Sequence, residues 1–217
     1  MSSHNEITTK TDRLNFQKGQ FFQTHLSLTP AEADALHQRY YIDYGLAIEG
    51  LVRHHRVDPL SFNAQVDDAI PLEDIFPKPD AHLRRFLRDR LDRRAVKPWL
   101  LTNAYVRHAR RVLRLLGVED MFEGLTYCDY AAERIICKPF PAMYEKAMRE
   151  AGVEDVRDCY FVGMFVRARV IVDTHVFILA LETNSFFSFF LLVKRRLIHK
   201  RSRRPKLWLD NCPSHRT

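Results

Sequence analysis

The chain has 217 residues, of which 46% are hydrophobic and 12% aromatic, and it carries a formal net charge of +7. This composition indicates a packed core and excludes a disordered or fibrous chain, and the length suits one domain with a smaller one inserted or appended. From Met164 onward there are 11 Lys and Arg against 3 Asp and Glu, whereas the preceding residues hold 23 against 24. The basic charge therefore belongs to the tail, and it does not by itself indicate a nucleic-acid-binding protein.

The cysteines and the N-terminus bear on the cellular compartment. Cys128, Cys137, Cys159 and Cys212 form no Cys-x-x-Cys pair and no spacing typical of a disulfide framework, so we expect reduced thiols and no zinc site. Residues 1–20 are polar and lack the apolar stretch of a signal peptide. We therefore expect a disordered N-terminal segment and a cytoplasmic location, with the nucleus as a second compartment.

Residues 21–77 predict an all-helical unit. The sequence TPAE at residues 29–32 is a capping box with proline at the first helical position, and Gly45 stands where the helix that starts there would end. Asp58 followed by proline predicts the start of another short helix, and LAIEGLVRHHRV between them has apolar residues at helical spacing. Several prolines then interrupt the pattern and place the unit boundary near Pro77.

Strands and helices alternate between residues 78 and 163. HLRRFLRDRL predicts a helix, KPWLLTN a strand, AYVRHARRVLRLL a helix that ends at Gly117, and GLTYC a strand. PAMYEKAMREA then predicts a helix that ends at Gly152, and CYFVG predicts a strand. This alternation is typical of a parallel, doubly wound sheet, so we predict the α/β fold class with an all-helical accessory unit.

Three residues in this region could hold an anion. Thr102 and Asn103 follow a buried strand and precede a helix, which is where open parallel sheets bind ligands and where backbone amides attract anions. Lys138, fixed by the proline after it, could supply a positive charge for a phosphate. Each residue also has an ordinary interpretation, since Thr-Asn is a common helix cap and such a lysine is commonly a solvated loop residue. Likewise, His54 and His55 indicate a solvated helix surface rather than a metal site.

Taken in order, these segments resemble the haloacid dehalogenase superfamily, and within it the fungal pyrimidine 5′-nucleotidase group. The matching text is FFQTHLSL, HQRYYIDYGLAIEGLVRHHRVDP, VDDAIPLEDI, WLLTNAY, RLLGVEDMFEGLTYCDY, CKPFPAMYEKAMREAGV and YFV, and it covers about residues 21–162. The resemblance implies a Rossmann-like core with a helical cap and hydrolysis of pyrimidine nucleoside 5′-monophosphates through an aspartyl-phosphate. It also implies that Thr102 and Lys138 hold the phosphate and that Mg²⁺ is the cofactor.

Two parts of the family pattern are missing from this sequence. The family has a central first strand that ends in Asp-x-Asp, the nucleophile motif, whereas residues 1–20 contain one aspartate, Asp12, and no strand-like run. The family also has two acidic residues after the strand CYFV, where this chain reads Gly163-Met164-Phe165. We therefore expect a partial core without its first strand, no catalytic residue, no magnesium ligands and an inactive polypeptide.

Residues 164–217 predict an aberrant tail, apolar at first and then basic. Shifting the reading frame of RPKLWLDNCPSH by one base yields family-like text, so we interpret the tail as translated intron followed by an exon in the wrong frame. Transcript sequencing across the junctions tests this interpretation. An apolar part of the tail, with RVIVDTHVFILAL as the first candidate, could fill the lane of the missing strand and so protect the exposed edges.

The tail also allows two alternatives from other functional classes. Residues 194–206 include 8 Lys or Arg among 13 residues, which would suit nucleic acid. The apolar run HVFILALETNSFFSFFLLV would suit membrane attachment, although Glu182 and Asn184 near its middle oppose insertion. We favour neither partner and expect a pyrimidine nucleoside monophosphate as the ligand.

Overall fold

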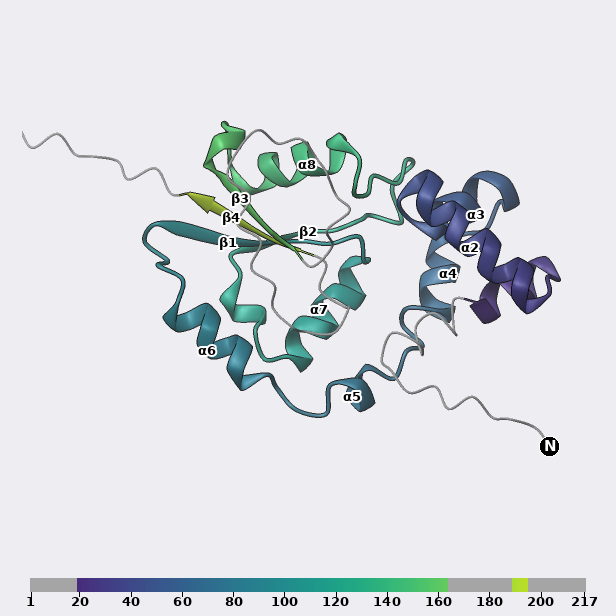
Figure 1. The fold of residues 1–217 in the computed structure, drawn as a ribbon, viewed down its shortest axis with the longest axis horizontal. Helices are drawn as coiled ribbons and strands as arrows, with labels where there is room; N and C mark the ends of the chain where they lie inside the picture. The colour runs from purple at the N-terminus through teal and green to yellow at the C-terminus, as the bar shows by residue number, and fades with distance from the viewer. Residues whose placement is uncertain (1–18, 164–188, 195–217) are drawn as a thin grey trace, which may run out of the picture.

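A computed structural model describes residues 19–163 and 189–194. Two lobes are visible, an all-helical one formed by residues 19–66 and an α/β one formed by the other described residues (Figure 1). Residues 1–18, 164–188 and 195–217 lie outside the described residues. They include most of the segment 1–20 that was predicted to be disordered, whose last two residues are helical, and most of the predicted tail 164–217, with all but the first residue of its basic run. Among the described residues, no helix has both the length and the apolar character needed to cross a membrane.

The helical lobe follows the predicted capping signals. A helix covers residues 19–26, and α2 Pro30–Tyr44, α3 Ala47–His55 and α4 Pro59–Gln65 follow it. Thr29 and Glu32 form the predicted capping box at the start of α2. The Glu32 carboxylate accepts from the Thr29 backbone N–H at 2.9 Å, and the Thr29 hydroxyl oxygen accepts from the Glu32 backbone N–H at 3.4 Å. Gly45 ends α2 with φ of 73°, a left-handed conformation that glycine adopts without strain.

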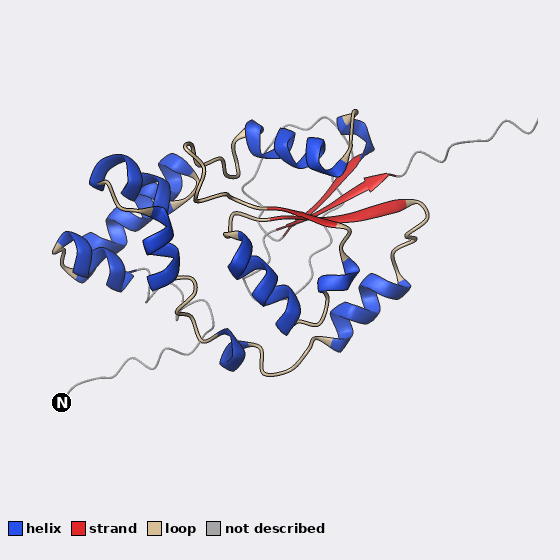
Figure 2. Ribbon diagram, turned by 180° about the vertical axis from the view of Figure 1, so that it is seen from behind, coloured by secondary structure: helices blue, strands red, loops and turns tan. Residues whose placement is uncertain are grey.

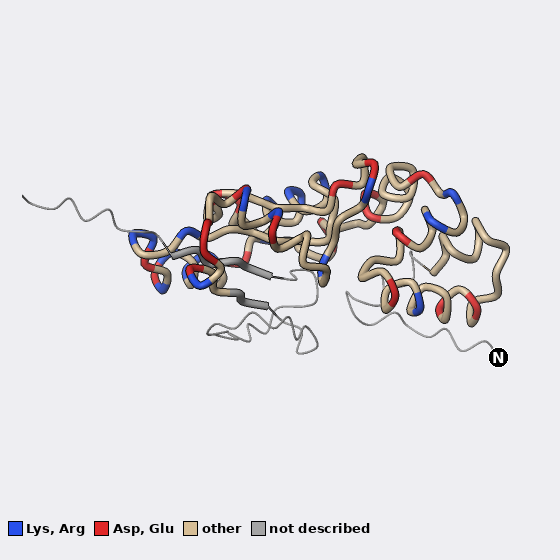
Figure 3. Tube along the Cα trace, turned by 90° about the horizontal axis from the view of Figure 1, so that it is seen from above, with Lys and Arg blue, Asp and Glu red and all other residues tan. Residues whose placement is uncertain are grey.

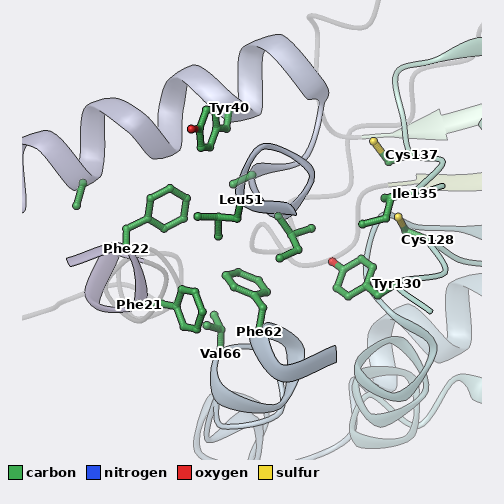
Figure 4. Packing of buried hydrophobic residues seen from close by; sticks show 13 residues of the cluster. Phe21, Phe22, Tyr40, Leu51, Phe62, Val66, Cys128, Tyr130, Ile135 and Cys137 are labelled. Carbon is green, nitrogen blue, oxygen red and sulfur yellow. The ribbon is translucent and has the colours of Figure 1, made fainter. Parts of the chain in front are cut away.

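One apolar cluster holds the helical lobe together and extends into the α/β lobe. Its aromatic residues Phe21, Phe22 and Phe62 are buried against Leu51 of α3. Figure 4 shows Tyr130, Ile135, Cys128 and Cys137, which belong to loops of the α/β lobe, at one side of this cluster. The two lobes are therefore joined by a shared hydrophobic core as well as by the chain.

The segment that links the lobes packs on the α/β side. It contains α5 Leu72–Ile75 and α6 Ala81–Asp89. Ile70, Leu72 and Ile75 are buried with α6 and with α7 Val106–Leu115, although the sequence pattern groups them with the helical unit. The last predicted residues of that unit thus contribute to the core of the other lobe.

The α/β lobe contains the remaining predicted elements. These elements are β1 Val96–Leu101, β2 Gly124–Thr126, α8 Pro141–Ala151 and β3 Cys159–Gly163, with two 3-10 turns at Glu119–Met121 and Val156–Asp158. Trp99 and Leu101 of β1 pack on α8, whereas Leu100 packs on α7, because alternate residues of a strand face opposite sides. Helices consequently cover both faces of the sheet (Figure 2), and the predicted α/β fold class is confirmed.

The sheet has four strands in the order β2-β1-β4-β3. The strands β1 and β2 are parallel, and β4 Phe189–Lys194 lies antiparallel between β1 and β3. Leu191 of β4 is in register with Trp99 on one side and with Phe161 on the other. The sheet is therefore mixed rather than parallel throughout. The strand between β1 and β3 is formed by the end of the apolar run HVFILALETNSFFSFFLLV and by Lys194, while the predicted candidate RVIVDTHVFILAL lies outside the described residues.

Candidate functional site

Thr102, Asn103 and Lys138 meet where the two lobes face each other. Thr102 and Asn103 follow β1 at its carboxyl end, and Lys138 lies in the loop between β2 and α8. This edge of the sheet is where open α/β folds place their ligands. The three residues selected from the sequence are thus neighbours in space, although 35 residues separate Asn103 from Lys138.

Asn103 ties the three segments together. Its side-chain oxygen accepts from the backbone N–H of Lys138 at 2.8 Å, and its amide donates to the carbonyl of Lys138 at 3.0 Å. The same amide donates to the carbonyl of Gly45 in the helical lobe at 3.5 Å. The Asn103 side chain is therefore engaged with backbone groups, which makes it a clamp for the Lys138 loop rather than an obvious ligand of phosphate.

Gly45 is required at this contact for a steric reason. A Cβ atom at this position would lie 2.4 Å from the carbonyl oxygen of Lys138, and the backbone there is already left-handed. Real Cβ atoms do not approach a carbonyl oxygen so closely. The turn between α2 and α3 can thus contact the Lys138 loop because Gly45 has no side chain.

Lys138 is a buried lysine, with 4% of its surface exposed. Its ammonium group donates to the carbonyl oxygen of Leu101, the last residue of β1, at 3.3 Å. Burial lowers the pKa of Lys138 well below its usual value, because the charged form loses solvation, while the thiols of Cys137 and Cys128 act in the opposite direction. An anion that enters this site would favour the charged form again.

The Thr102 hydroxyl lies at the same edge and is also nearly buried. Its oxygen accepts from the Ala104 N–H at 3.1 Å, and its backbone N–H donates to Thr126 of β2. A hydroxyl that accepts in this way keeps its own proton for donation. Thr102 therefore combines a fixed backbone with a donor suited to an oxyanion.

Tyr130 and Tyr105 pack against the backbone that carries Asn103. The buried Tyr130 donates from its hydroxyl to the Asn103 carbonyl at 3.3 Å, and its ring stacks on Tyr105 with a centroid distance of 5.4 Å. Burial raises the pKa of Tyr130 well above its usual value, and the nearby charge of Asp67 adds to this. Asp67 itself is buried.

The described residues do not fit a magnesium site. Mg²⁺ prefers several oxygen ligands, chiefly carboxylates and water. Within residues 19–163 and 189–194, no three His, Cys, Asp or Glu side chains gather closely enough to hold a metal ion. Asp129, which follows β2, accepts from the nearby Ala131 N–H at 3.0 Å, and β3 ends at Gly163 without a carboxylate. No catalytic step through magnesium can be built from these groups.

His54, His55 and the described cysteines are engaged in structural contacts rather than in a metal or catalytic site. His54 and His55 are exposed on α3, and their Nε2 atoms lie 2.7 Å and 2.8 Å from the hydroxyls of Tyr44 and Tyr40. Cys128, Cys137 and Cys159 are free, and burial raises the pKa of each thiol, to about 12 for Cys137 and about 11 for Cys159. Thiols with such pKa values are protonated near neutral pH and are poor nucleophiles. Cys212 lies outside the described residues.

Comparison with known proteins identifies the family. A family model described as haloacid dehalogenase-like hydrolase matches residues 15–163. The chain belongs to this family. Phosphate metabolism protein 8 of Saccharomyces cerevisiae is 37% identical over 149 residues, which cover 65% of this chain and 46% of that protein. The chain thus matches less than half of that curated relative. The family match ends at Gly163.

Sequence reasoning did not single out Gly45 or Tyr130 as parts of the site. Gly45 is visible in the sequence only as a helix stop, and its contact with Lys138 depends on how the lobes pack. Tyr130 lies in the family-like text TYCDY, which marks the segment but not the partner of its hydroxyl. The available signal was a tyrosine four residues beyond the end of β2, close to the carboxyl edge of the sheet.

Proposed function

We propose that this chain carries the phosphate-holding half of a haloacid dehalogenase-type phosphatase for pyrimidine nucleoside 5′-monophosphates, and that the 217-residue polypeptide binds the phosphate without hydrolysing the ester. The observation that carries the proposal is the buried Lys138 ammonium beside the carboxyl end of β1, 3.3 Å from the Leu101 carbonyl. In this role Lys138 balances the phosphate charge and Thr102 donates to a phosphate oxygen. Asn103 positions Lys138.

The proposed lack of hydrolysis follows from the chemistry. Transfer through an aspartyl-phosphate requires a carboxylate that attacks phosphorus, and a hydroxyl with an ammonium group can hold an anion but cannot replace that carboxylate. The residues of β4 next to the carboxyl ends of β1 and β3 are Phe190 and Phe189. Because Thr102 and Lys138 are nearly buried, phosphate entry also requires the two lobes to separate at the contact between Gly45 and Asn103.

The test combines binding and turnover on the full chain. We expect calorimetric titration with inorganic phosphate and UMP to show binding that is lost in Lys138→Met, while Mg²⁺-dependent phosphate release from UMP or CMP stays at background. Phosphate release by the wild-type chain that disappears in Lys138→Met would refute the lack of hydrolysis. Phosphate release that persists in Lys138→Met would identify a contaminating phosphatase. The calorimetric titration is not affected by such a contaminant. Equal phosphate binding by both proteins would refute the role of Lys138.

We further propose a cytoplasmic location, because free pyrimidine nucleotides are the ligands expected for this site. The nucleic-acid and membrane alternatives depend on tail residues that lie outside the described ranges. Across the described part, Lys and Arg lie among Asp and Glu on both lobes (Figure 3).

A further inference from the structure

A pocket of about 360 Å³ lies between the helical lobe and the loop that carries Lys138. Tyr44 and Arg53 line it from the α2–α3 side, while Arg134, Cys137 and Phe140 line it from the α/β lobe. Its volume falls within the range of about 300–1,000 Å³ that is usual for small-molecule sites. Neither the family match nor the relative's name assigns a role to it.

The charges in the pocket leave one arginine available. Glu49 pairs with Arg53, with 2.6 Å between Oε1 and Nε, and Asp43 pairs with Arg39 at 3.6 Å. Arg134 is exposed and forms no hydrogen bond or ion pair with the other described residues. A guanidinium group only donates hydrogen bonds, so a ligand that contacts Arg134 must present acceptors such as carbonyl oxygens.

The aromatic wall of the pocket is held rigidly. The Arg53 guanidinium lies 5.2 Å from the centroid of the Tyr44 ring, and the Tyr44 hydroxyl is bonded to His54 at 2.7 Å. The Cys137 thiol donates to the Tyr44 carbonyl at 3.2 Å and thereby fixes the loop against the same residue. Together with the half-exposed Phe140, this wall offers flat apolar surface to a planar ring.

The pocket adjoins the proposed phosphate site. Cys137 precedes Lys138, so their Cα atoms are about 3.8 Å apart, and Gly45 follows Tyr44 in the chain. Asn103 bonds to the carbonyls of both Gly45 and Lys138. The two chain segments that line the pocket are therefore the ones that the phosphate site is built on.

We propose that this pocket receives the base of a pyrimidine nucleotide, with Arg134 donating to a base carbonyl oxygen and Tyr44 and Phe140 contacting the ring. The proposal rests on the proposed function, because it assigns the nucleoside part of the same ligand. Uracil and cytosine both present a carbonyl oxygen at position 2, so one guanidinium donor can hold either pyrimidine. Arg134 thus becomes a residue that binds the base, and comparing uridine with adenosine tests whether the pocket selects pyrimidines.

The experiment measures the two halves of the ligand separately on the full chain. Uridine, adenosine, inorganic phosphate and UMP are titrated by calorimetry or ligand-observed NMR into wild type, Arg134→Ala, Arg134→Lys and Lys138→Met. Arg107→Ala serves as the matched control, because Arg107 is an exposed arginine on α7 and does not line this pocket. Arg134 is exposed, so its substitution leaves the fold intact, and Arg134→Lys retains the charge without the planar group.

We expect uridine affinity to fall about tenfold or more in Arg134→Ala, as for loss of one charge-assisted hydrogen bond, and to stay unchanged in Lys138→Met and Arg107→Ala. Arg134→Lys should fall between wild type and Arg134→Ala. The affinity for inorganic phosphate should fall in Lys138→Met and stay unchanged in Arg134→Ala. UMP should bind to wild type more tightly than uridine or inorganic phosphate, and its affinity should fall in both Arg134→Ala and Lys138→Met.

The outcomes separate this inference from the proposed function. Phosphate binding through Lys138 without uridine binding, or uridine binding that is insensitive to Arg134→Ala, would overturn the pocket assignment and leave the proposed function intact. Uridine binding through Arg134 without phosphate binding would overturn the proposed function alone. Adenosine binding as tight as uridine binding would overturn the assignment to pyrimidines, and UMP binding that is insensitive to Arg134→Ala would overturn the link between pocket and phosphate site.

Discussion

Replacing Asn103 by alanine tests whether the contact between the lobes depends on one side chain. Asn103 is the residue whose amide binds both backbone groups of Lys138, at 2.8 Å and 3.0 Å, and the Gly45 carbonyl at 3.5 Å. Alanine removes these bonds and retains the Cβ atom. Asn103→Ala therefore removes the hydrogen bonds to the Lys138 loop and to Gly45, and it changes the backbone preference of this loop position before α7 very little.

The expected loss of stability follows from the groups left behind. A buried donor or acceptor without a partner costs about 1–3 kcal/mol, and Asn103→Ala leaves the N–H and the carbonyl of the buried Lys138 without this partner. Asn103 is only half-buried, so water can replace part of the loss, and we expect the free energy of unfolding to fall by about 2–4 kcal/mol. This is a large share of the roughly 5–15 kcal/mol that stabilises a typical domain.

Urea denaturation followed by circular dichroism measures this loss. The matched control is Gln65→Ala, because Gln65 is an exposed amide whose side chain, among the described residues, bonds to nearby Ser61 alone, at 2.8 Å. We expect the control to change the free energy of unfolding by less than about 0.5 kcal/mol, as is usual at exposed positions. If both variants unfold at the same urea concentration as wild type, Asn103 does not stabilise the contact and the clamp argument is wrong.

Three further variants or conditions test other steps of the reasoning. Gly45→Ala should lower the free energy of unfolding by more than about 1 kcal/mol in urea, because its Cβ would meet the Lys138 carbonyl oxygen at 2.4 Å; unchanged stability would contradict the close approach. Leu191→Pro should lower the thermal midpoint, whereas Leu191→Val should not. Leu191 is in register with Trp99 of β1 and with Phe161 of β3, and proline removes its backbone N–H, a loss worth about 1–3 kcal/mol within a sheet. Phosphate binding should take up a proton at pH values between the lowered pKa of Lys138 and 10.5, which calorimetry in buffers of different ionisation enthalpy detects; equal uptake by Lys138→Met would contradict it.

The sign of the last effect follows from the direction of the pKa shift. Burial lowers the pKa of Lys138 in the folded chain below its value of 10.5 in the unfolded chain. Between these two values the unfolded chain holds one more proton, so this group makes the free energy of unfolding rise with pH in that window. Below the lowered pKa both states are protonated, and the cost of the buried charge is then fully present. An anion beside Lys138 offsets this cost and draws the proton in.

The local elements were predictable because their signals are local. The capping box before α2, the glycines after α2 and α8, and the apolar runs of β1 and β3 each depend on residues within a few positions in the chain. Thr102 and Asn103 were found for the same reason, since a polar pair between a strand and a helix marks the carboxyl edge of a sheet.

The contacts between the lobes were not predictable in the same way. Asn103 binds the carbonyls of Gly45 and Lys138, which lie 58 and 35 residues away from it in the chain. These hydrogen bonds depend on how the distant segments pack. No periodicity or capping rule carries such information. The burial of Asp67 is of the same kind, because its acidic neighbours indicate solvent until α7 is placed against them, with His108 bonded to the Asp67 carbonyl at 3.1 Å.

The position of β4 shows why the fold can be completed without the chemistry. A strand buried on both faces reads as a continuous apolar run, so the sequence indicates neither its direction nor its neighbours. Between β1 and β3, any such run satisfies the backbone groups of both strands, and an antiparallel one does so as well as a parallel one. Direction matters only at the edge, where a parallel strand would deliver its last residues beside Thr102. An antiparallel strand delivers its first residues instead, here Phe189 and Phe190. β4 therefore pairs with both neighbouring strands, while its described residues at this edge carry no carboxylate.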